Sequence, residues 1–223
     1  MSDQLPYGPF QSTEFVDNPE PRVACVLLLD VSGSMSGHPI EELNSALVSF
    51  KDTMAADTLA SKRAEIAVVT FGGAVEVVQD FVTADFFVPP LLRSHGDTPM
   101  GRAIEMAIDM VTERKQAYKS AGVSYYRPWV FLITDGGPTD AWQSAASRVR
   151  KGESEKAFAF FAVGVDNADM EKLSMISSRE PLKLRGLQFR DLFLWLSQSM
   201  QSVSRSSPGD KLSLPAPSGW LEV

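Results

Sequence analysis

Short hydrophobic runs of strand length alternate along the chain with longer segments of helical periodicity. The runs at Val23–Leu29, Trp129–Thr134 and Ala157–Val165 are almost continuously apolar, which is typical of strands that are covered on both faces. The segments between and after them repeat apolar residues every three or four positions. This alternation predicts an α/β domain in three layers, with an open, mostly parallel, twisted sheet and helices on both of its faces.

Five helices are expected from the periodic segments. The clearest stripe follows the first strand, where Pro39 can open the helix at its first turn, and consists of Ile40, Leu43, Leu47, Phe50 and Met54. The other four helices are predicted at Met100–Tyr118, at about 141–151, at Asp169–Ser177 and at Phe189–Val203.

One strand is expected to run against the others. The stretch EIAVVTFGGAVEVVQDF places Gly72 and Gly73 between two β-branched runs, which is a hairpin signal. A hairpin pairs antiparallel strands, and such a pair fits best at the edge of a mostly parallel sheet. We therefore predict one antiparallel edge strand after this turn.

The length and composition favour one domain with two extensions. The chain has 223 residues, of which 44% are hydrophobic, enough for a single sizeable core. Residues 1–21 and 204–223 are rich in proline or serine and lack periodicity. We predict an extended N-terminal arm at 1–21, the domain at 22–203 and a C-terminal tail at 204–223, which either packs back on the domain or docks on a partner.

The charge and the apolar runs argue against two classes of partner. The formal net charge is −7 and the sequence pI is about 4.9, so the surface should repel nucleic acid and anionic lipid. No run approaches the ~18 apolar residues of a membrane span, and the N-terminus does not resemble a signal peptide. The single cysteine, Cys25, lies in an apolar run. A cytoplasmic location is expected.

Side chains with oxygen atoms gather in three loops. Loops that leave the carboxyl ends of neighbouring parallel strands share one crevice, where ligands bind. Hydroxyls and carboxylates are hard ligands suited to Mg²⁺, Mn²⁺ or Ca²⁺, so the loops together predict a metal site. The residues concerned are Asp30, Ser32, Ser34, Asp97, Thr98, Asp135 and Asp140.

Two other interpretations of these residues remain open. Asp30, Ser32 and Thr98 could cap the helices that follow them, Asp135 could begin a turn, and Asp140 could cap a helix or lie in the second shell of the metal. His38 and His95 could join Asp30 in a zinc site, but their spacing matches no zinc pattern. The two histidines are more simply polar residues at the rim.

The three loops resemble a known metal site. D-x-S-x-S after an apolar strand, the later G-x-T-P-M-G and LITDGGPTD are similar to the metal-ion-dependent adhesion site (MIDAS) of von Willebrand factor A domains, over roughly residues 22–203. The resemblance implies that Ser32, Ser34 and Thr98 bind a divalent ion through their hydroxyls. It also implies that Asp30 and Asp135 act on the ion directly or through water.

A narrower group within that family is also suggested. The stretches LLLDVSGSMSGHPIEELN, RPWVFLITDGGPTDAW and FLWLSQSMQSVS resemble the bacterial TerY-like proteins of tellurite-resistance and stress-response clusters. This resemblance implies a scaffold whose partners are tellurite-resistance proteins, or an associated kinase and PP2C-type phosphatase.

The expected function is capture of a carboxylate. Neutral hydroxyls leave most of the ion's charge uncompensated, so an Asp or Glu of another protein would complete its shell. Mg²⁺ is the expected ion, with Mn²⁺ or Ca²⁺ possible. The residues expected to contact the partner around it are Gly33, Met35, Ser36, His38, His95, Asp97, Gly136 and Asp140.

An enzyme is the alternative. Mg²⁺-dependent phosphohydrolases of the haloacid dehalogenase type also place an Asp after the first strand, but they need a second acid two residues later. Ser32 occupies that position, and a hydroxyl cannot act as a general acid at neutral pH. A nucleophile elbow and a P-loop are absent from the sequence. We therefore predict a non-catalytic protein-binding module.

Overall fold

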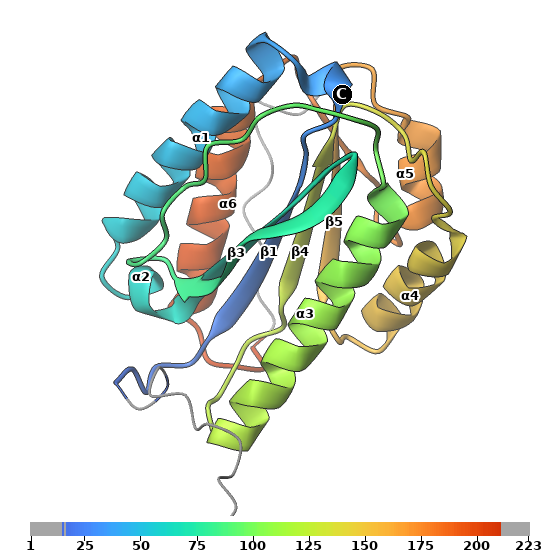
Figure 1. The fold of residues 1–223 in the computed structure, drawn as a ribbon. Coiled ribbons are helices and arrows are strands. Elements are labelled where there is room, and N and C mark those ends of the chain that lie inside the picture. The colour runs from blue at the N-terminus through green and yellow to red at the C-terminus, as the bar shows by residue number, and fades with distance from the viewer. Residues whose placement is uncertain (1–14, 16, 211–223) are drawn as a thin grey trace, which may run out of the picture.

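The computed structural model describes residues 15 and 17–210. Its centre is a six-stranded sheet with the strand order β3-β2-β1-β4-β5-β6 (Figure 1). Neighbouring strands are parallel, except that β3 is antiparallel to β2 at one edge. The strands are β1 (Val23–Asp30), β2 (Ala64–Gly72), β3 (Ala74–Thr83), β4 (Trp129–Thr134), β5 (Ala159–Val165) and β6 (Leu182–Leu184).

Helices cover both faces of this sheet, which confirms the predicted three-layer α/β fold. Figure 1 shows α1 and α6 together on one face and α3, α4 and α5 on the other. The helices are the 3-10 turn η2 (Gly33–Met35), α1 (His38–Ala55), α2 (Ala60–Arg63), α3 (Met100–Ala121), α4 (Gln143–Ser154), α5 (Met170–Ile176) and α6 (Phe189–Ser204).

The central strand β1 explains why the first hydrophobic run is continuous. Every residue of β1 is buried. Leu27 and Leu29 pack in the core under α1 and α6, whereas Val26 and Leu28 pack in the core under α3 and α4. Each buried leucine contributes roughly 1.5–3 kcal/mol through the hydrophobic effect. A polar residue at any of these four positions would face a helix rather than water.

The predicted hairpin at the sheet edge is confirmed. Gly72 pairs with Ala74 across the turn, and Gly73 between them adopts a left-handed backbone with φ of 68°, which favours glycine. Most of β3 is exposed or half-buried, as expected of an edge strand. The hairpin turn lies at the same end of the sheet as the loops after β1 and β4, which is the carboxyl end of the parallel strands.

Element boundaries differ modestly from the sequence prediction. α3 continues three residues past Tyr118, because Gly122 takes the left-handed conformation that ends the helix, with φ of 69°. β5 begins at Ala159 rather than at residue 157. The short elements α2 and β6 were not predicted, since runs of three or four residues carry no periodicity.

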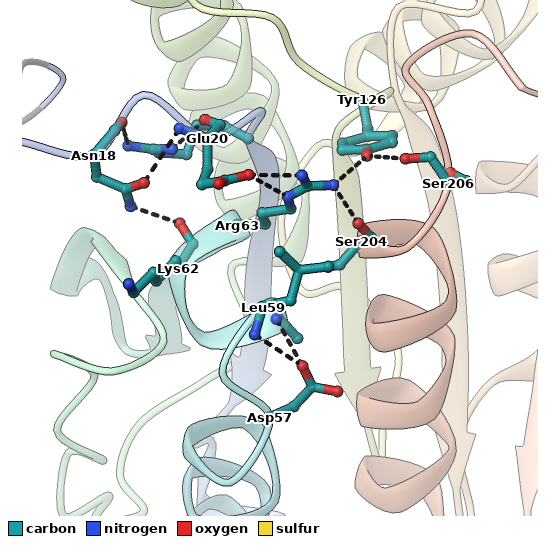
Figure 2. A network of polar contacts seen from close by, with 11 residues as sticks. Asn18, Glu20, Asp57, Leu59, Lys62, Arg63, Tyr126, Ser204 and Ser206 are labelled. Carbon is teal, nitrogen blue, oxygen red and sulfur yellow. Dashed lines mark hydrogen bonds and ion pairs between the residues drawn. The ribbon is translucent and has the colours of Figure 1, made fainter.

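A network of polar contacts joins distant segments at the amino-terminal ends of the parallel strands (Figure 2). Arg63, which directly precedes β2, donates to Glu20 Oε2 at 2.8 Å and to the carbonyl of Ser204 at 2.5 Å. Tyr126 donates its hydroxyl to the carbonyl of Ser206 at 2.6 Å. These contacts fix the end of α6 against α2 and the segment before β1.

Asp57 caps the short helix α2 within the same region (Figure 2). Its Oδ1 accepts hydrogen bonds from the backbone N–H groups of Leu59 at 3.1 Å and Ala60 at 2.9 Å, and its other oxygen pairs with Arg205. Such a cap is worth about 1 kcal/mol. It lies at the opposite end of the sheet from the loops after β1 and β4.

The described residues contain no helix that is both long and apolar enough to cross a membrane. The fate of the proline-rich tail beyond residue 210, fold-back or docking, lies outside the described residues.

Candidate metal centre

The strand register brings the first and third oxygen-rich loops together. β1 and β4 are parallel neighbours with Leu29 opposite Ile133, so Asp30 and Thr134 end the two strands side by side. The hydroxyl of Thr134 donates to Asp30 Oδ2 at 2.5 Å, and the backbone N–H of Ser32 donates to Asp30 Oδ1 at 2.8 Å. Both oxygens of the fully buried Asp30 carboxyl are therefore held in place.

Three further oxygens converge close to Asp30. The hydroxyls of Ser32 and Ser34 lie 3.0 Å apart, and Ser34 donates to Asp135 Oδ1 at 2.7 Å although the two residues are 101 positions apart. Adjacent ligands of an octahedral Mg²⁺, each at about 2.1 Å, are separated by about 3 Å. The spacing and the chemistry of this donor set therefore fit a hard divalent cation.

The second loop is tied to the first by backbone hydrogen bonds. Gly33 donates its N–H to the carbonyl of Gly96 at 2.9 Å, and His95 donates to the carbonyl of Val31 at 2.7 Å. This pairing brings the buried Thr98 to the same carboxyl end of the strands. The structure thus joins the oxygens of Asp30, Ser32, Ser34 and Asp135 through hydrogen bonds, and it holds the backbone of the Thr98 loop against the first loop.

Local side-chain capping does not explain Ser32 or Thr98. The residues at the N-cap positions of η2, α1 and α3 are Ser32, Gly37 and Pro99, and no side-chain cap hydrogen bond is made at any of them. α4 begins after Trp142, again without a side-chain cap. Asp140 does cap a helix, but that helix is α3 rather than the following α4.

Burial disfavours the ionised form of the two carboxyl groups of the site. Burial raises the pKa of Asp30, an effect that hydrogen bonds from Ser32 and Thr134 oppose and that the nearby Asp135 reinforces. Burial likewise raises the pKa of Asp135, with a hydrogen bond from Ser34 opposing it and the charge of Asp166 adding to it. A bound cation would favour the ionised form of both groups.

The structure corrects one predicted contact residue. Met35 is fully buried in the core beneath α1, so its side chain is not available to a partner; the 3-10 turn directs this apolar residue inward. The other seven residues lie at or near the surface. Gly33, Ser36, His38, His95 and Asp97 are exposed, and Gly136 and Asp140 are half-buried.

The histidines do not form a zinc site. His38 lies 3.8 Å from Glu42 on its own helix, and His95 Nδ1 lies 3.2 Å from the carbonyl of Arg93. Within residues 15 and 17–210, no cluster of three or more His, Cys, Asp or Glu side chains is placed to hold a metal. The candidate centre has only two carboxylates, those of Asp30 and Asp135, because its other proposed donors are hydroxyls.

Sequence reasoning missed Thr134 and Thr139. Thr134 ends the apolar run of β4, where its sequence position indicates only a strand residue, yet its hydroxyl donates a hydrogen bond to Asp30. Thr139 accepts a hydrogen bond from the backbone N–H of Thr98 at 3.1 Å. Only the register of β1 against β4 and the path of the loops reveal these contacts, so no local signal could have identified them.

Gly96 is expected to be essential to the packing of the loops. Its φ is 69°, and a Cβ there would lie 2.5 Å from Gly73 Cα. Gly96→Ala should lower the free energy of unfolding by about 1–2 kcal/mol for the left-handed backbone and by a further 1–3 kcal/mol for the overlap, measured by urea denaturation. Gly122→Ala is the matched control, since Gly122 also has φ of 69° but open space around it. Equal losses in the two variants would contradict the tight loop packing.

A sequence model of the von Willebrand factor type A domain matches residues 25–185. Domains of this family are typically non-catalytic binding modules. No curated protein matches the chain in sequence. Solved structures do match, and each of those compared below is under 20% identical to this chain, which shows a shared fold.

Three of these solved structures differ in how much of their own length this chain covers. Proximal thread matrix protein 1 of the mussel byssus, solved with a zinc-occupied MIDAS motif, is 17% identical, with 82% of this chain and 48% of that chain covered and a TM-score of 0.58. The pilus adhesin SpaC of Lactobacillus rhamnosus GG, in its open conformation, is 13% identical, with 82% and 30% covered and a TM-score of 0.65.

The third is the vWF domain of the type V pili tip protein Mfa5 of Porphyromonas gingivalis. It is 13% identical, with 86% of this chain and 99% of that domain covered and a TM-score of 0.63. This chain therefore spans about half of the mussel protein but nearly all of the Mfa5 domain. With the family match extending over most of its length, the chain belongs to the von Willebrand factor type A domain family.

Proposed function

We propose that this chain is a non-catalytic, metal-dependent protein-binding module that captures a carboxylate of a partner protein. Its proposed ligands are Ser32, Ser34 and Thr98 through their hydroxyls, with Asp30 and Asp135 binding directly or through water. The observation that carries the proposal is the convergence of the Ser32, Ser34 and Asp135 oxygens within hydrogen-bond distance of one another, on loops far apart in sequence.

The charge balance of the donor set supports capture of an anion. Three of the five donors are neutral hydroxyls, and Asp30 already accepts two hydrogen bonds. When bound, a divalent cation would offer its remaining coordination position and its excess charge to a carboxylate oxygen of the partner. Ser34 is exposed, so the site opens toward the surface where such a group could approach.

Mg²⁺ is the proposed ion, with Mn²⁺ and Ca²⁺ as alternatives, because the donors are all oxygens. The zinc-occupied motif of the mussel protein makes Zn²⁺ a further ion to test. Around the ion, the exposed or half-buried Gly33, Ser36, His38, His95, Asp97 and Gly136 are proposed to contact the partner.

The environment of Asp30 disfavours the phosphohydrolase alternative. A haloacid dehalogenase nucleophile must be accessible to the substrate, whereas Asp30 is fully buried. The position two residues later holds the Ser32 hydroxyl, which cannot act as a general acid at neutral pH. The site is therefore suited to binding rather than to phosphate transfer.

We further propose that the domain occupies residues 22–203 and acts in the cytoplasm as a TerY-like scaffold of a bacterial tellurite-resistance or stress system. The support is the sequence resemblance of LLLDVSGSMSGHPIEELN and RPWVFLITDGGPTDAW, which contain the first and the third oxygen-rich loops. The location is also consistent with Cys25, the single cysteine of the sequence, being fully buried in β1. Tellurite-resistance proteins, or an associated kinase and PP2C-type phosphatase, are the proposed partners.

A pull-down tests partner capture. The tagged chain is incubated with a purified tellurite-resistance protein in Mg²⁺, in EDTA, and as the Asp30→Ala and Ser34→Ala variants. We expect recovery of the partner in Mg²⁺ and at least a tenfold loss in the other three samples. Equal recovery in Mg²⁺ and EDTA would count against docking through the ion. Absence of binding in every sample would exclude that partner.

A further inference from the structure

We propose that Asp140 is a positioning residue for the metal centre, which holds the Thr98 loop in place by clamping the start of α3. The inference rests on the proposed function, because Thr98 is one of its proposed ligands. Asp140 itself lies in the loop after β4, the same loop that carries Asp135. The clamp would therefore fix the spacing of two proposed ligands that come from different loops.

The carboxylate of Asp140 supplies the cap that α3 lacks locally. Its Oδ1 accepts the backbone N–H of Gly101 at 2.8 Å, and its Oδ2 accepts the N–H of Arg102 at 2.9 Å. The residue before the helix is Pro99, which makes no side-chain cap. A carboxylate is also favoured at a helix N-terminus by the helix dipole. Asp140 thus satisfies two orphan N–H groups of a helix that began 40 residues earlier in the chain.

The neighbouring residue Thr139 holds the backbone of Thr98 on both sides. Its hydroxyl accepts the N–H of Thr98 at 3.1 Å, and its own N–H donates to the carbonyl of Thr98 at 3.0 Å. Together with the Asp140 contacts, four hydrogen bonds join the segment from Thr98 to Arg102 to two consecutive residues. The position of the Thr98 backbone is therefore set by the loop after β4.

Close packing reinforces these hydrogen bonds. A Cβ on Gly101 would lie 2.4 Å from the carbonyl oxygen of Ala141 and 2.9 Å from Trp142 Cα. The first turn of α3 therefore lies directly against the backbone that follows Asp140. A shift of either segment would move the other, since no space separates them.

The contacts of Asp140 leave it little capacity for another role. Its side chain is 18% exposed, both oxygens accept backbone N–H groups, and Arg102 Nε lies 3.8 Å from Oδ2. A partner contact or a direct metal bond would have to use the remaining lone pairs of oxygens that already hold the start of α3. The sequence had allowed capping, a second-shell role and a partner contact, and the geometry favours an indirect role through Thr98.

The test compares Asp140→Ala with Asp57→Ala. Both residues accept two backbone N–H groups at a helix start, and both lie near an arginine, but Asp57 is at the opposite end of the sheet (Figure 2). Both variants should lose a helix cap of the same kind. Mn²⁺ affinity is measured by titration at a temperature at which all variants are folded.

We expect Asp140→Ala to weaken Mn²⁺ binding about 10- to 100-fold, the range seen when a residue that orients metal ligands is removed, while Asp57→Ala keeps the native affinity. In the metal-free protein, amide exchange at residues 98–102 should be faster in Asp140→Ala alone. Asp140→Asn keeps one acceptor oxygen and the side-chain shape. Its Mn²⁺ affinity should therefore lie between those of the native protein and Asp140→Ala.

Native Mn²⁺ affinity in Asp140→Ala would overturn the positioning role and leave Asp140 as an ordinary helix cap. If Asp140→Ala does not fold, native affinity in Asp140→Asn together with native amide exchange at 98–102 would do the same. If the native protein itself binds no Mn²⁺, the metal centre fails and the positioning role falls with it. The native titration thus separates failure of the site from failure of the clamp.

Discussion

Mg²⁺ or Mn²⁺ at a hundredfold excess over its Kd is expected to raise the unfolding midpoint of the metal-stripped protein by roughly 5–10 °C. Binding to the folded state alone adds about 2.7 kcal/mol at that excess, and a domain of this size gains about 2–4 °C per kcal/mol. The proposed ligands come from three loops that meet only in the folded chain. The measurement is thermal unfolding with Mg²⁺, Mn²⁺, Ca²⁺ and Zn²⁺ in parallel.

The matched control is the double variant Ser32→Ala/Ser34→Ala, which removes two hydroxyls and retains the carboxylates of Asp30 and Asp135. Its midpoint should not respond to the hard cations. A shift of equal size in the variant would mean that the ions bind elsewhere on this acidic protein. No shift in the native protein at millimolar Mg²⁺ or Mn²⁺ would contradict a site that is complete without its partner.

Glu65→Ala is expected to lower the free energy of unfolding by about 3–5 kcal/mol, because it breaks a buried ion-pair network. Glu65 and Arg22 are both fully buried, and Arg22 Nε lies 3.0 Å from Glu65 Oε1. Arg114 Nε lies 2.6 Å from Oε2, which also accepts the hydroxyl of Tyr118. Burial, and next the charge of Glu65, raise the pKa of Tyr118, so Tyr118 stays a neutral donor.

The expected fall in the unfolding midpoint is roughly 6–20 °C at 2–4 °C per kcal/mol, because Arg22 would be left buried without its carboxylate. Glu105→Ala is the control: Glu105 also pairs with an arginine, Arg148, but both side chains are at least 30% exposed. Surface ion pairs contribute about 0–1 kcal/mol. Similar falls of the unfolding midpoint in the two variants would show that burial does not set the contribution of the Glu65 network to stability.

The alternation of apolar runs and helical stripes determined the layers of this protein. Strands such as β1 must be apolar at every position because helices cover both faces of the sheet. The run of consecutive apolar residues therefore indicates the burial directly. The hairpin at Gly72 and Gly73 was equally local, since a tight turn needs glycine where φ is positive. The sequence also located the oxygen-rich loops, because each follows or faces the end of a recognisable element.

The tertiary structure alone decided how those loops combine. Thr134 holds Asp30 because the register places the ends of β1 and β4 side by side, and a register between strands about 100 residues apart leaves no trace in local periodicity. Asp140 caps α3 rather than the helix that follows it, because the path of the chain brings its loop against Gly101. Met35 turns inward with η2 and leaves the surface. Local sequence patterns indicate which residues are buried and whether a segment is a helix or a strand. Contacts between loops depend instead on where the whole sheet places the ends of its strands.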